Sequence, residues 1–120
     1  MRDHKLYIKD IIEAIESIEI FIEGMNFEDF KQDDKTSSAA IRKLEIIGEA
    51  TKNIPAKIKD DYPQIPWKAM AGMRDKLIHF YFGVNYELLW ETVIHRIPQI
   101  KPLIRQIDKS YNTEDQINRE

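Results

Sequence analysis

The chain reads LYIKDIIEAIESIEIFIEG from Leu6 to Gly24, and the order of apolar and charged residues in this stretch defines the class of fold. Isoleucines recur here at steps of three and four residues, which is the spacing of one face of an α-helix. They are Ile8, Ile11, Ile12, Ile15, Ile18 and Ile22. The stretch therefore predicts an amphipathic helix that ends near Gly24 and buries one face in a core.

Helical spacing continues through the rest of the chain, and no segment alternates convincingly with the period of a β-strand. The predicted helices span residues 38–53, 67–81 and 85–107, with a short helical turn at 55–62. Polar residues of segment 33–38 supply possible N-caps, Asn85 caps the last helix, and Pro98 and Pro102 kink or restart it. The sequence thus predicts an all-α fold, an antiparallel bundle of four to five helices.

The length of 120 residues suits one domain, which we place at residues 1–110, followed by a polar, frayed tail at 111–120. The net charge of −3 excludes a general nucleic-acid coat, which would need many Lys and Arg residues. The chain contains no cysteine, so disulfides and thiolate metal sites are excluded. No apolar run approaches the roughly 20 residues that span a bilayer, and the charged N-terminus does not look like a secretory signal. We therefore expect a cytoplasmic protein that does not enter a membrane.

Gly48 lies in the middle of the second predicted helix. A glycine there costs roughly 1 kcal/mol relative to alanine. We therefore expect a neighbouring helix to approach closely at this position.

Residues 72–83 read GMRDKLIHFYFG and hold the candidate functional residues. Arg74 is a permanent cation that binds phosphate, and His79 exchanges protons near neutral pH. Tyr81 adds a hydroxyl group. An anion-binding group beside a proton shuttle suits phosphodiester cleavage without a metal. No set of His, Asp and Glu has metal-ligand spacing, so we expect neither a metal nor another cofactor.

Several segments, in this order and spacing, resemble the HepT-like members of the HEPN superfamily, small all-α proteins usually encoded beside a minimal nucleotidyltransferase. The segments are residues 6–11, 27–30, 44–50, 65–67 and 73–83, with Trp90 and the pair Ile97-Pro98. The resemblance implies a ribonuclease toxin of a toxin–antitoxin pair. It also implies that Arg74 and His79 are catalytic, that Asp75 assists them, and that the partner nucleotidyltransferase attaches AMP to Tyr81 to silence the toxin.

RNA cleavage needs a base, an acid and a cation, and one histidine does not readily serve as both base and acid. A two-fold homodimer would bring a second Arg74 and His79 to the same groove, so we expect a composite site. Lys68 and Lys76 are the further candidates for RNA contact, although they also fit a solvated surface. A non-catalytic module that docks a nucleotidyltransferase and accepts a nucleotide on Tyr81 is the alternative function, and a plain nucleotide-binding helical domain is a third.

Ideal helical geometry constrains this site. On a helix from 67 to 81, Arg74 and His79 would lie about 140° apart around the axis. Asp75 and His79 would share a face as an i, i+4 pair, so the carboxylate would be able to orient the imidazole ring. A purely structural alternative for Arg74 is an ion pair with a buried carboxylate such as Glu49.

Overall fold

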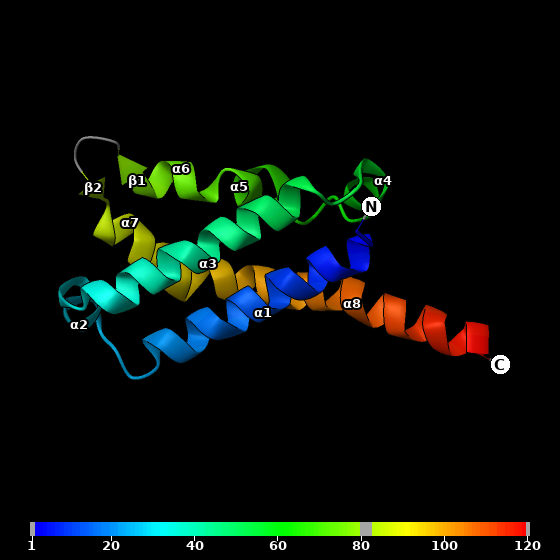
Figure 1. The fold of residues 1–120 in the computed structure, drawn as a ribbon, viewed down its shortest axis with the longest axis horizontal. Helices are drawn as coiled ribbons and strands as arrows, with labels where there is room; N and C mark the ends of the chain where they lie inside the picture. Colours follow the sequence, from blue (N-terminus) through cyan, green and yellow to red (C-terminus); the bar gives the residue numbers. More distant parts are fainter. Residues whose placement is uncertain (1, 80–82, 120) are drawn as a thin grey trace.

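The computed structural model describes residues 2–79 and 83–119, with the side chains of residues 2–78 and 83–113. Helices account for most of this part of the chain, and its β structure is limited to one short hairpin. The molecule is elongated, measuring 53 × 29 × 25 Å, and its long helices run along the longest dimension (Figure 1). Neighbouring helices run in opposite directions. The predicted all-α antiparallel bundle is confirmed.

Helix α1 (His4–Ile22) forms the centre of the core. Asp3 begins the helix by accepting a hydrogen bond from the Lys5 N–H at 2.9 Å. Five of the six isoleucines of the predicted face are buried, as their spacing predicted, and Ile22 is partly buried. It packs against α3 (Asp34–Lys52) and α8 (Ile97–Arg119), both of which run antiparallel to α1 (Figure 1). Among the described helices, none is both long enough and apolar enough to cross a membrane.

Helix α2 (Phe27–Gln32) connects α1 to α3 at one end of the bundle. Asn26 and Asp29 form a reciprocal capping box that fixes its start. The ring of the fully buried Phe30 lies 5.1 Å from the ring of Trp90 in α7 (Tyr86–Glu91), measured between centroids. This aromatic contact holds α2 against α7.

Helix α3 begins four residues earlier than the sequence predicted. Asp33 is its N-cap and accepts hydrogen bonds from the Thr36 N–H at 3.0 Å and the Thr36 hydroxyl at 2.9 Å. The backbone hydrogen bond is the larger of two effects by which Thr36 lowers the pKa of the Asp33 carboxyl group. Segment 33–38, which was predicted to supply the N-cap, does so through its first residue, Asp33.

Gly48 of α3 lies against α5 (Trp67–Ala71), which follows the short helix α4 (Ala56–Asp61). A Cβ atom built at Gly48 would lie 3.2 Å from the backbone oxygen of Ala71 and 3.4 Å from that of Met70. These are backbone atoms, which cannot rotate away as the end of a flexible side chain would. The predicted close helix approach is confirmed.

We expect Gly48→Val to destabilise the protein by about 1–3 kcal/mol, because the added methyl groups overpack this crossing. Urea unfolding followed by far-UV circular dichroism measures the loss. Gly72→Ala is the control, because a Cβ atom there meets only the Lys68 carbonyl oxygen at an ordinary 3.7 Å. Equal stability of Gly48→Val and the parent would contradict the packing described here.

The prediction of one helix from 67 to 81 is wrong. The helix breaks at Gly72, resumes as α6 (Met73–Leu77), and gives way to strand β1 (Ile78–His79). Strand β1 pairs antiparallel with β2 (Gly83–Val84), and the Leu77 carbonyl oxygen accepts a hydrogen bond from the Asn85 N–H at 2.8 Å. Gly83 has a φ of 79°, which a glycine adopts at little cost. This left-handed residue allows the chain to turn back where helical periodicity alone would continue.

The last part of the chain forms one continuous helical column. Asn85 caps α7 as predicted, by accepting a hydrogen bond from the Leu88 N–H at 3.1 Å. A π-helical turn, η1 (Thr92–Arg96), separates α7 from α8. The helix restarts beside Pro98, as predicted, but continues through Pro102.

Helix α8 continues through Arg119, and Tyr111 is buried, so residues 111–119 are helical where the sequence predicted a frayed tail. The division into a domain at 1–110 and a tail at 111–120 stays a prediction.

Candidate active site

The segment that carries the candidate residues lies on the surface of the bundle, and buried side chains of helix α6 anchor it to the core. Met73 and Leu77, one turn apart on α6, are 8% and 2% exposed and belong to the core. The three residues between them are all exposed: Arg74, Asp75 and Lys76. Helix α6 packs on α3, so its buried pair fixes the position from which the three polar side chains project.

Arg74 projects toward α3. Its Nε atom lies 3.4 Å from Oε1 of Glu45, and the two side chains are 51% and 32% exposed. Glu45 also lies 3.8 Å from the guanidinium group of Arg42, measured between Oε2 and Nη1. The ion pair considered for Arg74 therefore exists, but with Glu45 instead of Glu49, and it is not buried. Glu49 contacts Lys52 instead, at 3.3 Å.

A small cavity of about 200 Å³ lies between α3 and α6, and we call it the α3-side cavity. Its lining residues are Glu45, Gly48, Glu49, Lys52, Ala71, Arg74 and Asp75. The structure thus brings Arg74 and Asp75 together, but among three carboxylates and two cations. An anion bound here in a single chain would face more negative than positive side chains.

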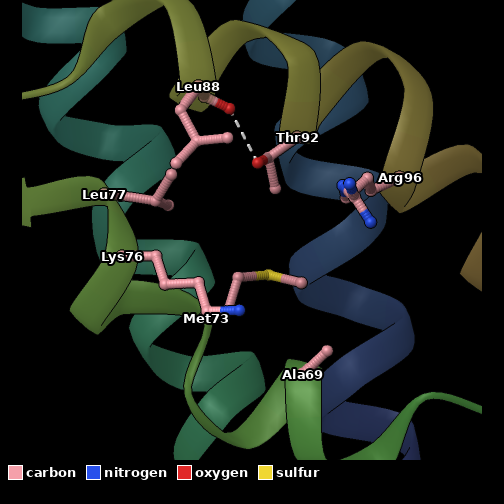
Figure 2. Close-up of a pocket in the computed structure, with 7 residues that line it drawn as sticks. All are labelled: Ala69, Met73, Lys76, Leu77, Leu88, Thr92 and Arg96. Atoms are coloured by element: carbon pink, nitrogen blue, oxygen red, sulfur yellow. Dashed lines mark hydrogen bonds between the residues drawn. The ribbon is translucent and has the colours of Figure 1, made fainter.

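Lys68 and Lys76 line a second, shallow groove with Asp75 on the outer side of α5 and α6. Lys76 also lines a third cavity, which lies beside α7 and η1 and to which Arg96 contributes (Figure 2). The predicted cations therefore do not converge on one point. They flank α6 on two sides.

His79 lies in β1, where its backbone is paired with Gly83. The expected i, i+4 pair of Asp75 and His79 is wrong, because the helix ends at Leu77 and the two residues do not share a helical face. The angle of about 140° between Arg74 and His79 no longer applies for the same reason. The side chain of His79 and the whole of Tyr81 lie outside the part of the chain that the structure describes.

Two contacts near the candidate site were not predicted from the sequence. Glu45 carries the ion pair with Arg74, and its signal was the position of Gly48 three residues later, which marks where α3 meets the following helices. Arg96 shares a cavity with Lys76. The sequence feature that points to Arg96 is the neighbouring Pro98, which disturbs the regular helix. Among the side chains that the structure describes, no group of three or more His, Cys, Asp or Glu residues is arranged so that it could hold a metal ion.

Comparison with known proteins agrees with the resemblance seen in the sequence. The "Probable ribonuclease HepT" of Thermococcus cleftensis is 56% identical over 108 residues, covering 90% of this chain and 98% of the relative. A "Putative RNase" of Methanocaldococcus jannaschii is 46% identical over 115 residues, covering 96% of this chain and 95% of the relative. A third relative of similar name, from Caldanaerobacter subterraneus subsp. tengcongensis, is 43% identical over 107 residues, covering 89% of this chain and 96% of the relative.

No solved structure gives a significant match. The family described as "Ribonuclease HepT-like" matches residues 11–107, and so the chain belongs to this HepT-like family.

Proposed function

We propose that this protein is a metal-independent endoribonuclease that cleaves single-stranded RNA by transesterification and acts as the toxin of a toxin–antitoxin pair. The observation that carries the proposal is the exposed Arg74 on the anchored helix α6, five residues before His79. The ribonuclease names of the relatives support the same reaction. As an enzyme acting on cellular RNA, the protein would work in the cytoplasm.

The proposed chemistry assigns one role to each residue. His79 accepts the proton of the RNA 2′-hydroxyl group, and the resulting oxygen attacks the adjacent phosphorus atom. Arg74 stabilises the charge that develops on the phosphorane oxygens, and Asp75 assists the pair. A second proton donor transfers a proton to the departing 5′-oxygen. The products are a 2′,3′-cyclic phosphate and a free 5′-hydroxyl group.

The ion pair of Arg74 and Glu45 does not prevent this role. An exposed ion pair of this kind contributes only about 0–1 kcal/mol. Glu45 approaches Nε, whereas the two terminal nitrogens of a guanidinium group carry four of its five N–H donors. We propose that these donors bind the scissile phosphate and that the phosphate replaces Glu45 as the nearest anion.

We further propose that the active species is a homodimer whose two Arg74–His79 pairs face one groove. The chemistry supports this arrangement, because the reaction needs both a proton acceptor and a proton donor, and one histidine does not readily serve as both. A second copy would supply another Arg74 and a second histidine, which would serve as the proton donor. Lys68 and Lys76 would contact the RNA strand on the outer side of α6.

Regulation is proposed to come from a minimal nucleotidyltransferase that transfers AMP to Tyr81. The added phosphate would carry negative charge close to the motif and compete with RNA for the cations. We expect Tyr81→Phe to retain most of its RNA cleavage but to escape silencing when co-expressed with such a partner. Intact-mass spectrometry with peptide mapping measures the adduct. An AMP adduct at another residue of the Tyr81→Phe variant, together with full silencing, would exclude Tyr81 as the switch.

The proposed function is tested with the purified full-length protein and two labelled single strands of the same sequence, one RNA and one DNA. The RNA should be cleaved and the DNA left intact, because DNA lacks the attacking 2′-hydroxyl group. If neither strand is cleaved at any protein concentration, the enzyme proposal fails and the non-catalytic docking module remains. If both are cleaved, transesterification fails.

A further inference from the structure

The cavity on the other side of α6 differs from the α3-side cavity in charge and lining. It has a volume of about 240 Å³, and we call it the α7-side cavity. Its lining residues are Ala69, Met73, Lys76, Leu77, Leu88, Thr92 and Arg96. In a chain with a net charge of −3, this lining contains two cations and no carboxylate.

The apolar part of the cavity belongs to the fixed core. Met73 and Leu77 of α6 are almost completely buried, and Leu88 of α7 packs against the same core. Figure 2 shows Leu77 pointing toward Leu88, and Met73 and Lys76 extending across the opening below Thr92. Met73 and Leu77 also anchor the candidate active site, so the floor of the cavity is rigid.

Thr92 lines the cavity, and its hydroxyl group is turned toward the Leu88 carbonyl oxygen (Figure 2). The residue is 4% exposed, and its hydroxyl group donates a hydrogen bond to the Leu88 carbonyl oxygen at 2.7 Å (Figure 2). The single hydroxyl proton is thereby used, while the lone pairs of the oxygen still accept. A ligand group that meets Thr92 would therefore be an N–H or O–H donor.

The π-helical turn positions Arg96. The Ile97 N–H bonds to the Thr92 carbonyl oxygen five residues earlier, and Pro98 has no N–H with which to continue a regular α-helical pattern. Turns of this kind are frequent at functional sites. Thr92 and Arg96 stand at the two ends of the turn, and both line the cavity together with residues of α6. In the part of the chain with described side chains, neither Arg96 nor Lys76 forms an ion pair with a carboxylate.

We propose that the α7-side cavity binds one nucleotide of the RNA strand, the neighbour of the scissile phosphate. Its base would lie on Met73, Leu77 and Leu88 and donate a hydrogen bond to Thr92, while its phosphate contacts Arg96 and Lys76. Cavities that hold drug-sized ligands have volumes of about 300–1,000 Å³, so about 240 Å³ fits a single base better than a longer segment. His79 follows Leu77 by two residues, roughly 7 Å along an extended strand, so the cavity adjoins the candidate catalytic histidine.

This inference rests on the proposed function, because it assumes an RNA substrate. Binding is measured with the full-length protein and a fluorescent 2′-O-methyl oligoribonucleotide, which cannot undergo attack by its 2′-oxygen. We expect Arg96→Gln to weaken binding on the order of 10-fold and to reduce the salt slope by about 0.7, the value for one phosphate contact in a single strand. Arg105→Gln is the matched control, since Arg105 lies on α8 outside the cavity and pairs with Glu16 at 2.9 Å. It should leave the affinity close to that of the parent.

Methyl NMR of the methionines locates the bound nucleotide. The chain has four methionines, of which Met73 lines the cavity and Met25 lies between α1 and α2. The same oligonucleotide, and separately AMP at high concentration, should shift the Met73 methyl signal and leave that of Met25 in place. Thr92→Val should weaken binding of the oligonucleotide with little change in volume.

The failures of the two proposals are distinguishable. If the protein cleaves RNA but Arg96→Gln binds as the parent does and Met73 does not shift, the nucleotide pocket is excluded and the enzyme proposal stands. If no RNA is cleaved but the oligonucleotide and AMP both shift the Met73 methyl signal, the nucleotide pocket is supported and the enzyme proposal fails. If Arg96→Gln changes only the oligomeric state, the cavity holds a second copy of the chain and the inference is overturned.

Discussion

His79→Ala should lower the rate of RNA cleavage by about 10²–10⁴-fold, because it removes the proposed proton acceptor. The thermal unfolding curve should stay close to that of the parent, since β1 is a two-residue strand at the end of the bundle. Cleavage of a labelled oligoribonucleotide under single-turnover conditions measures the effect on the chemical step. His95→Ala is the matched control, because His95 is exposed and lies on η1, outside β1.

Full activity of His79→Ala would remove this histidine from the mechanism. Equal losses in His79→Ala and His95→Ala would point to a general effect on the fold or on RNA binding instead. Neither result is expected.

Arg74→Ala should reduce the cleavage rate by about 10²–10³-fold, the usual cost of removing a group that stabilises a developing oxyanion. The free energy of unfolding should change by no more than about 1 kcal/mol, because the ion pair with Glu45 is half-exposed. Both quantities are measured on the same preparation, by single-turnover cleavage and by urea unfolding. Arg42→Ala, which removes the other cation near Glu45, should leave both nearly unchanged.

A stability loss of several kcal/mol in Arg74→Ala would contradict the catalytic role of Arg74 and support a structural role.

Mixing the Arg74→Ala and His79→Ala proteins tests the composite site. In a mixed dimer, one chain keeps Arg74 and the other keeps His79. Activity of the mixture above that of either variant supports a shared groove, whereas no gain would assign both residues to the same chain.

The core of this fold was predictable because the spacing of apolar residues that produces it is local and recurs along the chain. The isoleucine face of α1 and the glycine at position 48 each gave a prediction that the structure confirms. The end of α6 was not predictable from periodicity, since Ile78 continues the apolar pattern that α6 begins. The pairing of β1 with β2 and the left-handed conformation of Gly83 determine where the helix stops.

The surroundings of the candidate site depend on how helices cross, which the sequence does not state. Glu45 and Glu49 lie four residues apart on α3, about 6 Å along its axis. The position at which α6 meets α3 selects Glu45 as the partner of Arg74. Arg96 joins Lys76 in one cavity only because η1 places the last helical column beside α6.

The most direct test of the central proposal is the identity of the RNA ends formed by the purified protein in EDTA. Mass spectrometry of the products of a defined single-stranded oligoribonucleotide distinguishes the possible ends. We predict cleavage that persists in EDTA and yields a 2′,3′-cyclic phosphate with a free 5′-hydroxyl group. Cleavage that stops in EDTA, or products with a 5′-phosphate, would contradict transesterification by Arg74 and His79.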